Sequence, residues 1–136
     1  MLFRSAVSNG TGYVGETAGV VGSVAVNGMG SLWINNVLNV GYEGAGALNI
    51  TNNGHVQNSY AAIGYLAGSV GTVVVDGVGS KLINDELYVG HGGQGTLNIT
   101  NGGRSNSNSC VIALTAGSSG TVNINGAGSI WSNFDK

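Results

Sequence analysis

Apolar residues alternate with small or polar residues in five short segments of the chain. In each segment two apolar positions are separated by one residue and are followed by Asn, Thr or Asp. An alternation with a period of two predicts a β-strand that buries one face. The predicted core ladder consists of Val24 and Val26, Leu48 and Ile50, Val73 and Val75, Leu97 and Ile99, and Val122 and Ile124.

These segments belong to a 49-residue repeat, because residues 22–31 recur at 71–80 and again at 120–129. Each repeat is itself double, since Val-Gly or Ile-Gly pairs begin at residues 14, 40, 63 and 89, in steps of 26, 23 and 26 residues. Segments spaced in this way can stack in parallel, with like residues above like. We therefore predict an all-β, parallel β-helix (solenoid) in one domain over residues 1–136, with two coils in each repeat.

The predicted β-helix has about five to six coils, each with roughly three short strands separated by Gly-rich corners. Asn27-Gly28, Asp76-Gly77 and Asn125-Gly126 supply residues that tolerate a positive φ, which predicts corners at Gly28, Gly77 and Gly126. The 26 glycines and the β-branched apolar positions argue against helices. The handedness of parallel crossovers favours a right-handed coil.

Charge is sparse, with four Lys and Arg residues against six Asp and Glu residues. So few cations predict no basic patch for nucleic acid. No apolar run is long enough for a membrane-spanning helix, and residues 1–7 contain no export signal. Cys110 has no second cysteine for a disulfide, and we interpret it as a small buried thiol.

The repeat resembles a known family in residues 63–64, 68–80, 87–90 and 95–103, and in Trp33 and Trp131, which follow Gly-x-Gly-Ser. The segments are similar to the tandem repeats of type V secretion (autotransporter) passenger domains and related surface proteins of Gram-negative bacteria. The resemblance covers nearly the whole chain. It implies a right-handed β-helical passenger that crosses the outer membrane and is displayed on the cell or released, often for adhesion or self-association.

The chain departs from that family in having neither a signal peptide nor a membrane barrel, so a membrane would be involved only through a missing barrel domain. It also begins and ends inside a repeat. We expect a fragment of a longer passenger, a degenerate gene product or an expressed piece of one.

Catalytic chemistry on a β-helix needs carboxylates or a calcium cluster gathered on one face. Here the acids are scattered, and the adjacent Asp85 and Glu86 correspond to Asn36 and Val37 in the preceding repeat. Thr96 occupies the place of the aspartate in a calcium-binding nonapeptide. We therefore predict no catalytic residues, no metal site and no cofactor.

The position after each Val-Gly or Ile-Gly is a candidate binding column. It reads Glu16, Tyr42, Tyr65, His91 and Leu114 in successive coils. Tyr42, Tyr65 and His91 form a possible binding stripe on which a host or environmental glycan, or a protein surface, could lie. The alternative, which we favour, is that these rings stack on one another and stabilise the coils.

The outward positions of the core strands form polar columns, of which the most regular is Ser23, Ala47, Thr72, Thr96 and Thr121. We interpret them as a solvated surface, although threonine rows also occur in ice-binding solenoids. The leading hypothesis is a non-enzymatic structural and adhesive segment of a secreted or cell-surface bacterial β-helix. The alternatives are the scaffold of a carbohydrate-binding or carbohydrate-active β-helix and, ranked last, a flat-face ice binder. Unpaired strands at both ends also predict possible end-to-end self-association.

Overall fold

The computed structural model describes residues 5–134. Three charged residues lie outside this range: Arg4, Asp135 and Lys136. Residues 1–4 of the N-terminal segment 1–7, which was predicted to contain no export signal, also lie outside it. The described chain is all β, as predicted, with eleven strands and no helix. The strands are β1 (Ala6–Val14), β2 (Val21–Asn27), β3 (Leu32–Val40), β4 (Ala45–Thr51), β5 (His55–Ile63), β6 (Val70–Asp76), β7 (Lys81–Val89), β8 (Gln94–Thr100), β9 (Arg104–Ile112), β10 (Ser119–Asn125) and β11 (Ile130–Asn133).

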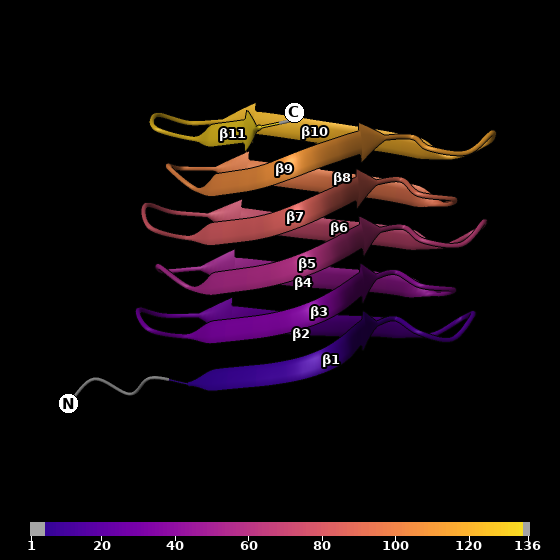
Figure 1. The fold of residues 1–136 in the computed structure, drawn as a ribbon, viewed down its shortest axis with the longest axis horizontal. Helices are drawn as coiled ribbons and strands as arrows, with labels where there is room; N and C mark the ends of the chain where they lie inside the picture. The colour runs from indigo at the N-terminus through magenta and orange to yellow at the C-terminus, as the bar shows by residue number, and fades with distance from the viewer. Residues whose placement is uncertain (1–4, 135–136) are drawn as a thin grey trace.

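The strands form two parallel sheets that face each other. The odd-numbered strands make a six-stranded sheet in the order β1-β3-β5-β7-β9-β11, and the even-numbered strands make a five-stranded sheet from β2 to β10. In Figure 1 the six-stranded sheet lies in front and runs from left to right, the other sheet runs back behind it, and the chain climbs from β1 to β11. This path confirms the predicted right-handed β-helix.

The predicted steps of 26 and 23 residues are confirmed by the register of the six-stranded sheet. Asn9 lies 26 positions below Asn35, Asn35 lies 23 below Asn58, and Asn58 lies 26 below Asn84. The two lengths arise between the strands, because one coil uses residues 15–20 and 28–31 as connections and the next uses only 41–44 and 52–54. The strands therefore keep a constant register while the corners absorb the difference.

The prediction of three strands in each coil is wrong, since each coil has two. The physical reason is a bend at the centre of each nine-residue strand. The register between β3 and β5 passes from Asn35↔Asn58 directly to Val37↔Tyr60, which leaves Asn36 and Ser59 unpaired. At the same place in β7, Asp85 and Glu86 are both exposed, so the alternation restarts after the bend. One bent strand thus forms two sides of the coil.

The interior contains the predicted core ladder. Leu48, Ile50, Val73, Val75, Leu97 and Ile99 have at most 1% of their surface exposed, and Val26 has 7%. Val24 and Val122 are partly buried, since they lie on β2 and β10, the outermost strands of their sheet. Ile124 departs from the prediction with 49% exposure, because β10 carries no further strand of this sheet above it. The predicted corners Gly28, Gly77 and Gly126 all have positive φ, at 104°, 93° and 91°.

A ladder of asparagine side chains runs inside the six-stranded sheet, where the sequence predicted none. The side-chain amides of Asn9, Asn35, Asn58 and Asn84 are joined by hydrogen bonds of 2.9 Å, each Nδ2 donating to the Oδ1 one coil above. Asn35, Asn58 and Asn84 are buried. The ladder stops at Ser107, the next residue in register, and leaves Asn84 Nδ2 and Ser107 Oγ buried without a partner.

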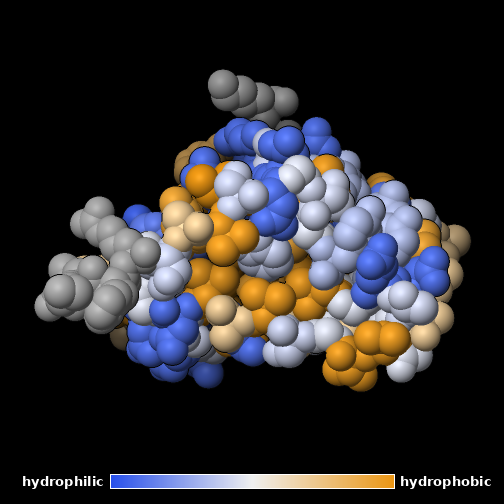
Figure 2. All heavy atoms as spheres, turned by 90° about the horizontal axis from the view of Figure 1, so that it is seen from below, coloured by the Kyte–Doolittle hydropathy of each residue, from blue (hydrophilic) through white to orange (hydrophobic). Residues whose placement is uncertain are grey.

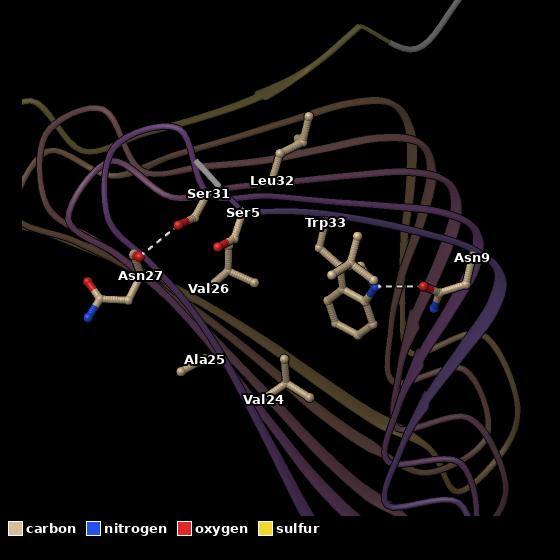
Figure 3. A pocket seen from close by; sticks show the side chains of 10 residues that line it. Ser5, Asn9, Val24, Ala25, Val26, Asn27, Ser31, Leu32 and Trp33 are labelled. Atoms are coloured by element: carbon tan, nitrogen blue, oxygen red, sulfur yellow. Dashed lines mark hydrogen bonds between the residues drawn. The ribbon is translucent and has the colours of Figure 1, made fainter. Parts of the chain in front are cut away.

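The end of the asparagine ladder at Ser107 also leaves an indole N–H without an acceptor. In the first repeat, Trp33 Nε1 donates to Asn9 Oδ1 at 3.3 Å, which Figure 3 shows in the view down the coils. The equivalent Trp131 Nε1 is buried without a partner, because the residue that corresponds to Asn9 there is Ser107. Position 107 thus lacks the asparagine side chain that the ladder has elsewhere, and three polar atoms remain without a partner, on Asn84, Ser107 and Trp131.

Replacing Ser107 with asparagine should therefore stabilise the protein. The new Oδ1 would accept from Asn84 Nδ2 and Trp131 Nε1, and the expected gain in the free energy of unfolding is about 1–2 kcal/mol. Urea titration followed by far-UV circular dichroism measures it. Ser107→Ala is the control and should change the unfolding free energy by less than about 0.5 kcal/mol, since it removes a hydroxyl that bonds nothing. An S107N variant no more stable than this control would contradict the ladder.

Candidate functional site

Six aromatic side chains from four successive coils form one continuous group on the outside of the six-stranded sheet, next to the loops that lead to the other sheet. We name this group the aromatic cluster. It consists of Tyr13, Tyr42, Tyr60, Tyr65, Tyr88 and His91.

The three predicted stripe residues form the spine of the aromatic cluster. Their backbones follow one another up the coils, since Tyr65 N–H donates to the carbonyl of Gly41 and His91 N–H to that of Gly64. The Tyr42 and Tyr65 rings are stacked, with centroids 5.1 Å apart and planes 9° from parallel. Tyr65 and His91 are stacked at 4.4 Å and 21°. The broad faces of these rings thus lie against each other.

The other three tyrosines were not predicted, although the register contains them. Tyr13 and Tyr88 occupy the same column one position before the Val-Gly pair, and Tyr60 lies two positions before that column. Tyr13 meets Tyr42 edge-on at 5.1 Å, Tyr88 meets His91 at 5.3 Å, and Tyr60 meets Tyr88 at 5.2 Å. Comparing every column across the repeats, and not only the one after Val-Gly, would have found them.

The aromatic cluster covers small residues on the outer face of the sheet. Ala62 and Asn39 share the column of Tyr13 and Tyr88, yet they have 0% and 4% exposure. Burial raises the pKa of Tyr60, and its neighbours Tyr65, Tyr88 and Glu86 raise it further. The Tyr60 phenol therefore stays neutral at physiological pH. The cluster behaves as a small external core. The ends of the predicted column, Glu16 and Leu114, are exposed and contribute no ring.

Two polar columns of the five-stranded sheet, beside the threonine column, contain hydrogen bonds between side chains. Asn123 Nδ2 donates to Asn98 Oδ1 at 2.9 Å, and Thr100 Oγ1 donates to Asp76 Oδ1 at 2.6 Å. The hydrogen bonds from Thr100 and then Asn101 lower the pKa of the Asp76 carboxyl. Groups that bond one another in this way are less available to order a layer of water, which is what an ice-binding face requires.

Cys110, His55 and His91 lie on different elements and form no group with one another. Cys110 packs against the core beside Leu87, and burial raises the pKa of its thiol to about 11. His55 begins β5 and His91 follows β7. Within residues 5–134, no three His, Cys, Asp or Glu side chains come close enough together to hold a metal ion.

The N-terminal end of the β-helix is hollowed. Figure 2 shows this end with hydrophobic side chains at its centre and hydrophilic ones around them. A cavity of about 460 Å³ opens there, with Val7, Val24 and Trp33 in its lining. In Figure 3 the Trp33 ring and Val24 both point into it. This cavity lies at the interior face of the first described coil.

The described residues include no helix with the length and hydropathy that a membrane span needs. Comparison of the chain with protein-family models, curated proteins and solved structures found no match.

Proposed function

We propose that this chain is a non-enzymatic structural segment of a secreted or cell-surface bacterial β-helix, whose outer surface makes adhesive contacts. The observation that supports the structural role is the geometry of the aromatic cluster. Sugars bind aromatic residues mainly through the ring faces, but the faces of Tyr42, Tyr65 and His91 are turned to one another. The rings therefore serve to hold successive coils together.

A surface location is consistent with the side-chain hydrogen-bond ladders and with the environment of the Cys110 thiol. Hydrogen-bonded side-chain ladders both inside and outside the coils add to the backbone pairing, which suits a segment that must persist outside the cell. The partly buried Cys110 thiol resists oxidation and disulfide exchange, because it ionises only at high pH. The resemblance to autotransporter passenger repeats adds the cell surface and adhesion to this proposal.

The structural role predicts that Tyr65→Ala destabilises the protein, because it removes the central ring of the stack. We expect the free energy of unfolding to fall by about 2–3 kcal/mol, while Tyr65→Phe, which keeps the ring, should cost less than about 1 kcal/mol. Tyr13→Ala is the matched control, since Tyr13 is 44% exposed and has one edge-on neighbour. Chemical denaturation of the four proteins measures the differences.

The same variants test the alternative, in which the stripe binds carbohydrate. On a glycan array, a structural stripe predicts the same profile for the wild-type protein and for Tyr42→Ala and Tyr65→Ala, measured where the variants remain folded. Specific glycan binding by the wild-type protein that both variants lose would overturn the structural assignment. It would make the aromatic cluster a carbohydrate site.

A further inference from the structure

A shallow groove of about 310 Å³ lies at the edge where the five-stranded sheet turns back into the six-stranded sheet. We name it the basic groove; it is lined by Val78, Gly79, Lys81, Gly102, Arg104 and Gly128. Lys81 begins β7 and Arg104 begins β9, and the two residues pair directly across neighbouring strands. They are the only Lys and Arg residues in positions 5–134. The described cations are thus gathered in one place.

No acidic side chain lines the basic groove. The acid nearest in sequence before Lys81 is Asp76, and its carboxylate accepts hydrogen bonds from Thr100 and Asn101. Farther along β7, Asp85 is bonded by Asn108, and Glu86 is bonded by Tyr88. Like charges directly opposite each other on adjacent strands, about 4.8 Å apart, are destabilising. An anion bound between Lys81 and Arg104 would remove that cost.

The groove itself is a repeated feature of the fold, but its charge is not. An equivalent groove of about 440 Å³ lies 49 residues earlier, where Leu32 takes the place of Lys81 and His55 that of Arg104. There His55 Nε2 lies 3.1 Å from the carbonyl oxygen of Gly79, so that nitrogen carries the proton and donates. In the third repeat, Ile130 takes the position of Lys81. Among the coils that the structure describes, only those of β7 and β9 place two permanent cations together.

We propose that the basic groove binds the carboxylate or sulfate group of an acidic oligosaccharide. The Arg104 guanidinium can bind such an oxyanion with two parallel hydrogen bonds, and Lys81 adds a second charge. Gly79, Gly102 and Gly128 add no side chains to the lining, and Gly128 is exposed, so a ligand can reach the backbone at that residue. Val78, which is 83% exposed, offers an apolar surface to the carbon-bound hydrogens of a sugar ring.

Nucleic acid fits the basic groove less well. Single strands are bound by a track of several cations together with aromatic rings that stack on the bases, and the lining has two cations and no ring. The site also goes beyond the proposed function, because Lys81 and the aromatic residue Tyr88 lie toward opposite ends of β7. Loss of binding here would therefore leave the structural role of the aromatic cluster untouched.

Isothermal titration at low salt tests the proposal with five probes: a uronic-acid oligosaccharide, a sulfated oligosaccharide, a neutral oligosaccharide of equal length, inorganic sulfate and a single-stranded oligonucleotide. The wild-type protein should bind at least one acidic oligosaccharide. Lys81→Ala and Arg104→Ala should each weaken that binding by about tenfold or more, and the neutral sugar should not bind. The matched gain-of-function control is Leu32→Lys combined with His55→Arg, which should add a second site to the equivalent groove.

Three results would overturn the proposal. The first is equal binding by the wild-type protein and the Lys81→Ala, Arg104→Ala double variant, with unchanged unfolding curves. The second is the absence of binding to both acidic oligosaccharides. The third is binding of inorganic sulfate, or of a single-stranded oligonucleotide, as tight as that of the acidic oligosaccharides, which would exclude saccharide recognition.

Discussion

Replacing Gly71 with alanine should lower the free energy of unfolding by about 3 kcal/mol or more, or prevent folding. Gly71 faces the interior where the two sheets converge. An added Cβ would lie 2.5 Å from the backbone nitrogen of Gly64 and 2.9 Å from Ile63 Cγ2, and closer still to the carbonyl oxygen of Val40. Gly64 N–H donates to that carbonyl at 2.8 Å, so neither group can move without breaking a bond between coils. Urea titration followed by far-UV circular dichroism measures the loss.

Alanine substitutions at two other glycines are the controls that distinguish this clash from the general effects of adding a methyl group. Gly68 lies in the same coil with a φ of 86° and open space around it, so Gly68→Ala should cost only the backbone strain, about 1 kcal/mol. Gly10 has open space and no positive φ, so Gly10→Ala should be close to neutral. If Gly71→Ala were no more destabilising than Gly68→Ala, the sheets would not converge as tightly as the structure places them.

The same geometry bears on the predicted end-to-end association. At Gly15, Gly41, Gly64 and Gly90, an added Cβ would strike the backbone of the strand that begins the five-stranded sheet one coil above. The corresponding residue in the last complete coil is Ala113, with a φ of 58°. Any further coil stacked in register would meet its methyl group. Stacking of a second copy on this end is therefore sterically opposed, while the association itself stays a prediction.

The repeat and the alternation were enough to predict the parallel β-helix, its coil lengths and the part of its core that lies on the five-stranded sheet. Like segments recur without insertion, and in a parallel stack that recurrence sets the register directly. The bend at Asn36, Ser59 and Asp85 was not visible, because a strand that turns while staying paired on either side looks the same in sequence as two strands. Hydrophobic pattern alone does not fix the number of sides of a coil.

The stripe of Tyr42, Tyr65 and His91 was predicted from one column, but the ring orientations that decide its role depend on side-chain packing. The basic groove was missed for a different reason. Lys81 and Arg104 are 23 residues apart, and counting charges along the chain hides the fact that this is one coil. The inner asparagines were missed because a polar residue at an inward position resembles a loop residue until its partners are known.

The second large predicted effect concerns these inner asparagines. Replacing Asn58 with alanine should lower the free energy of unfolding by about 3 kcal/mol or more. The change removes two hydrogen bonds and strands two buried groups, Asn35 Nδ2 and Asn84 Oδ1, at positions with 1% and 3% exposure. Each stranded group costs about 1–3 kcal/mol, on top of the cavity left by the amide. Urea titration with far-UV circular dichroism again measures the effect.

The matched control for Asn58→Ala is Asn98→Ala on the outer face, where the half-buried amide accepts one hydrogen bond from the exposed Asn123. Water can replace that bond, so this variant should lose less than about 1 kcal/mol. Similar losses for the two variants would mean that water reaches the interior of the six-stranded sheet. A loss confined to Asn58→Ala would show that the amide ladder fixes how each coil sits on the next, because its hydrogen bonds can form only when the asparagines are directly in register.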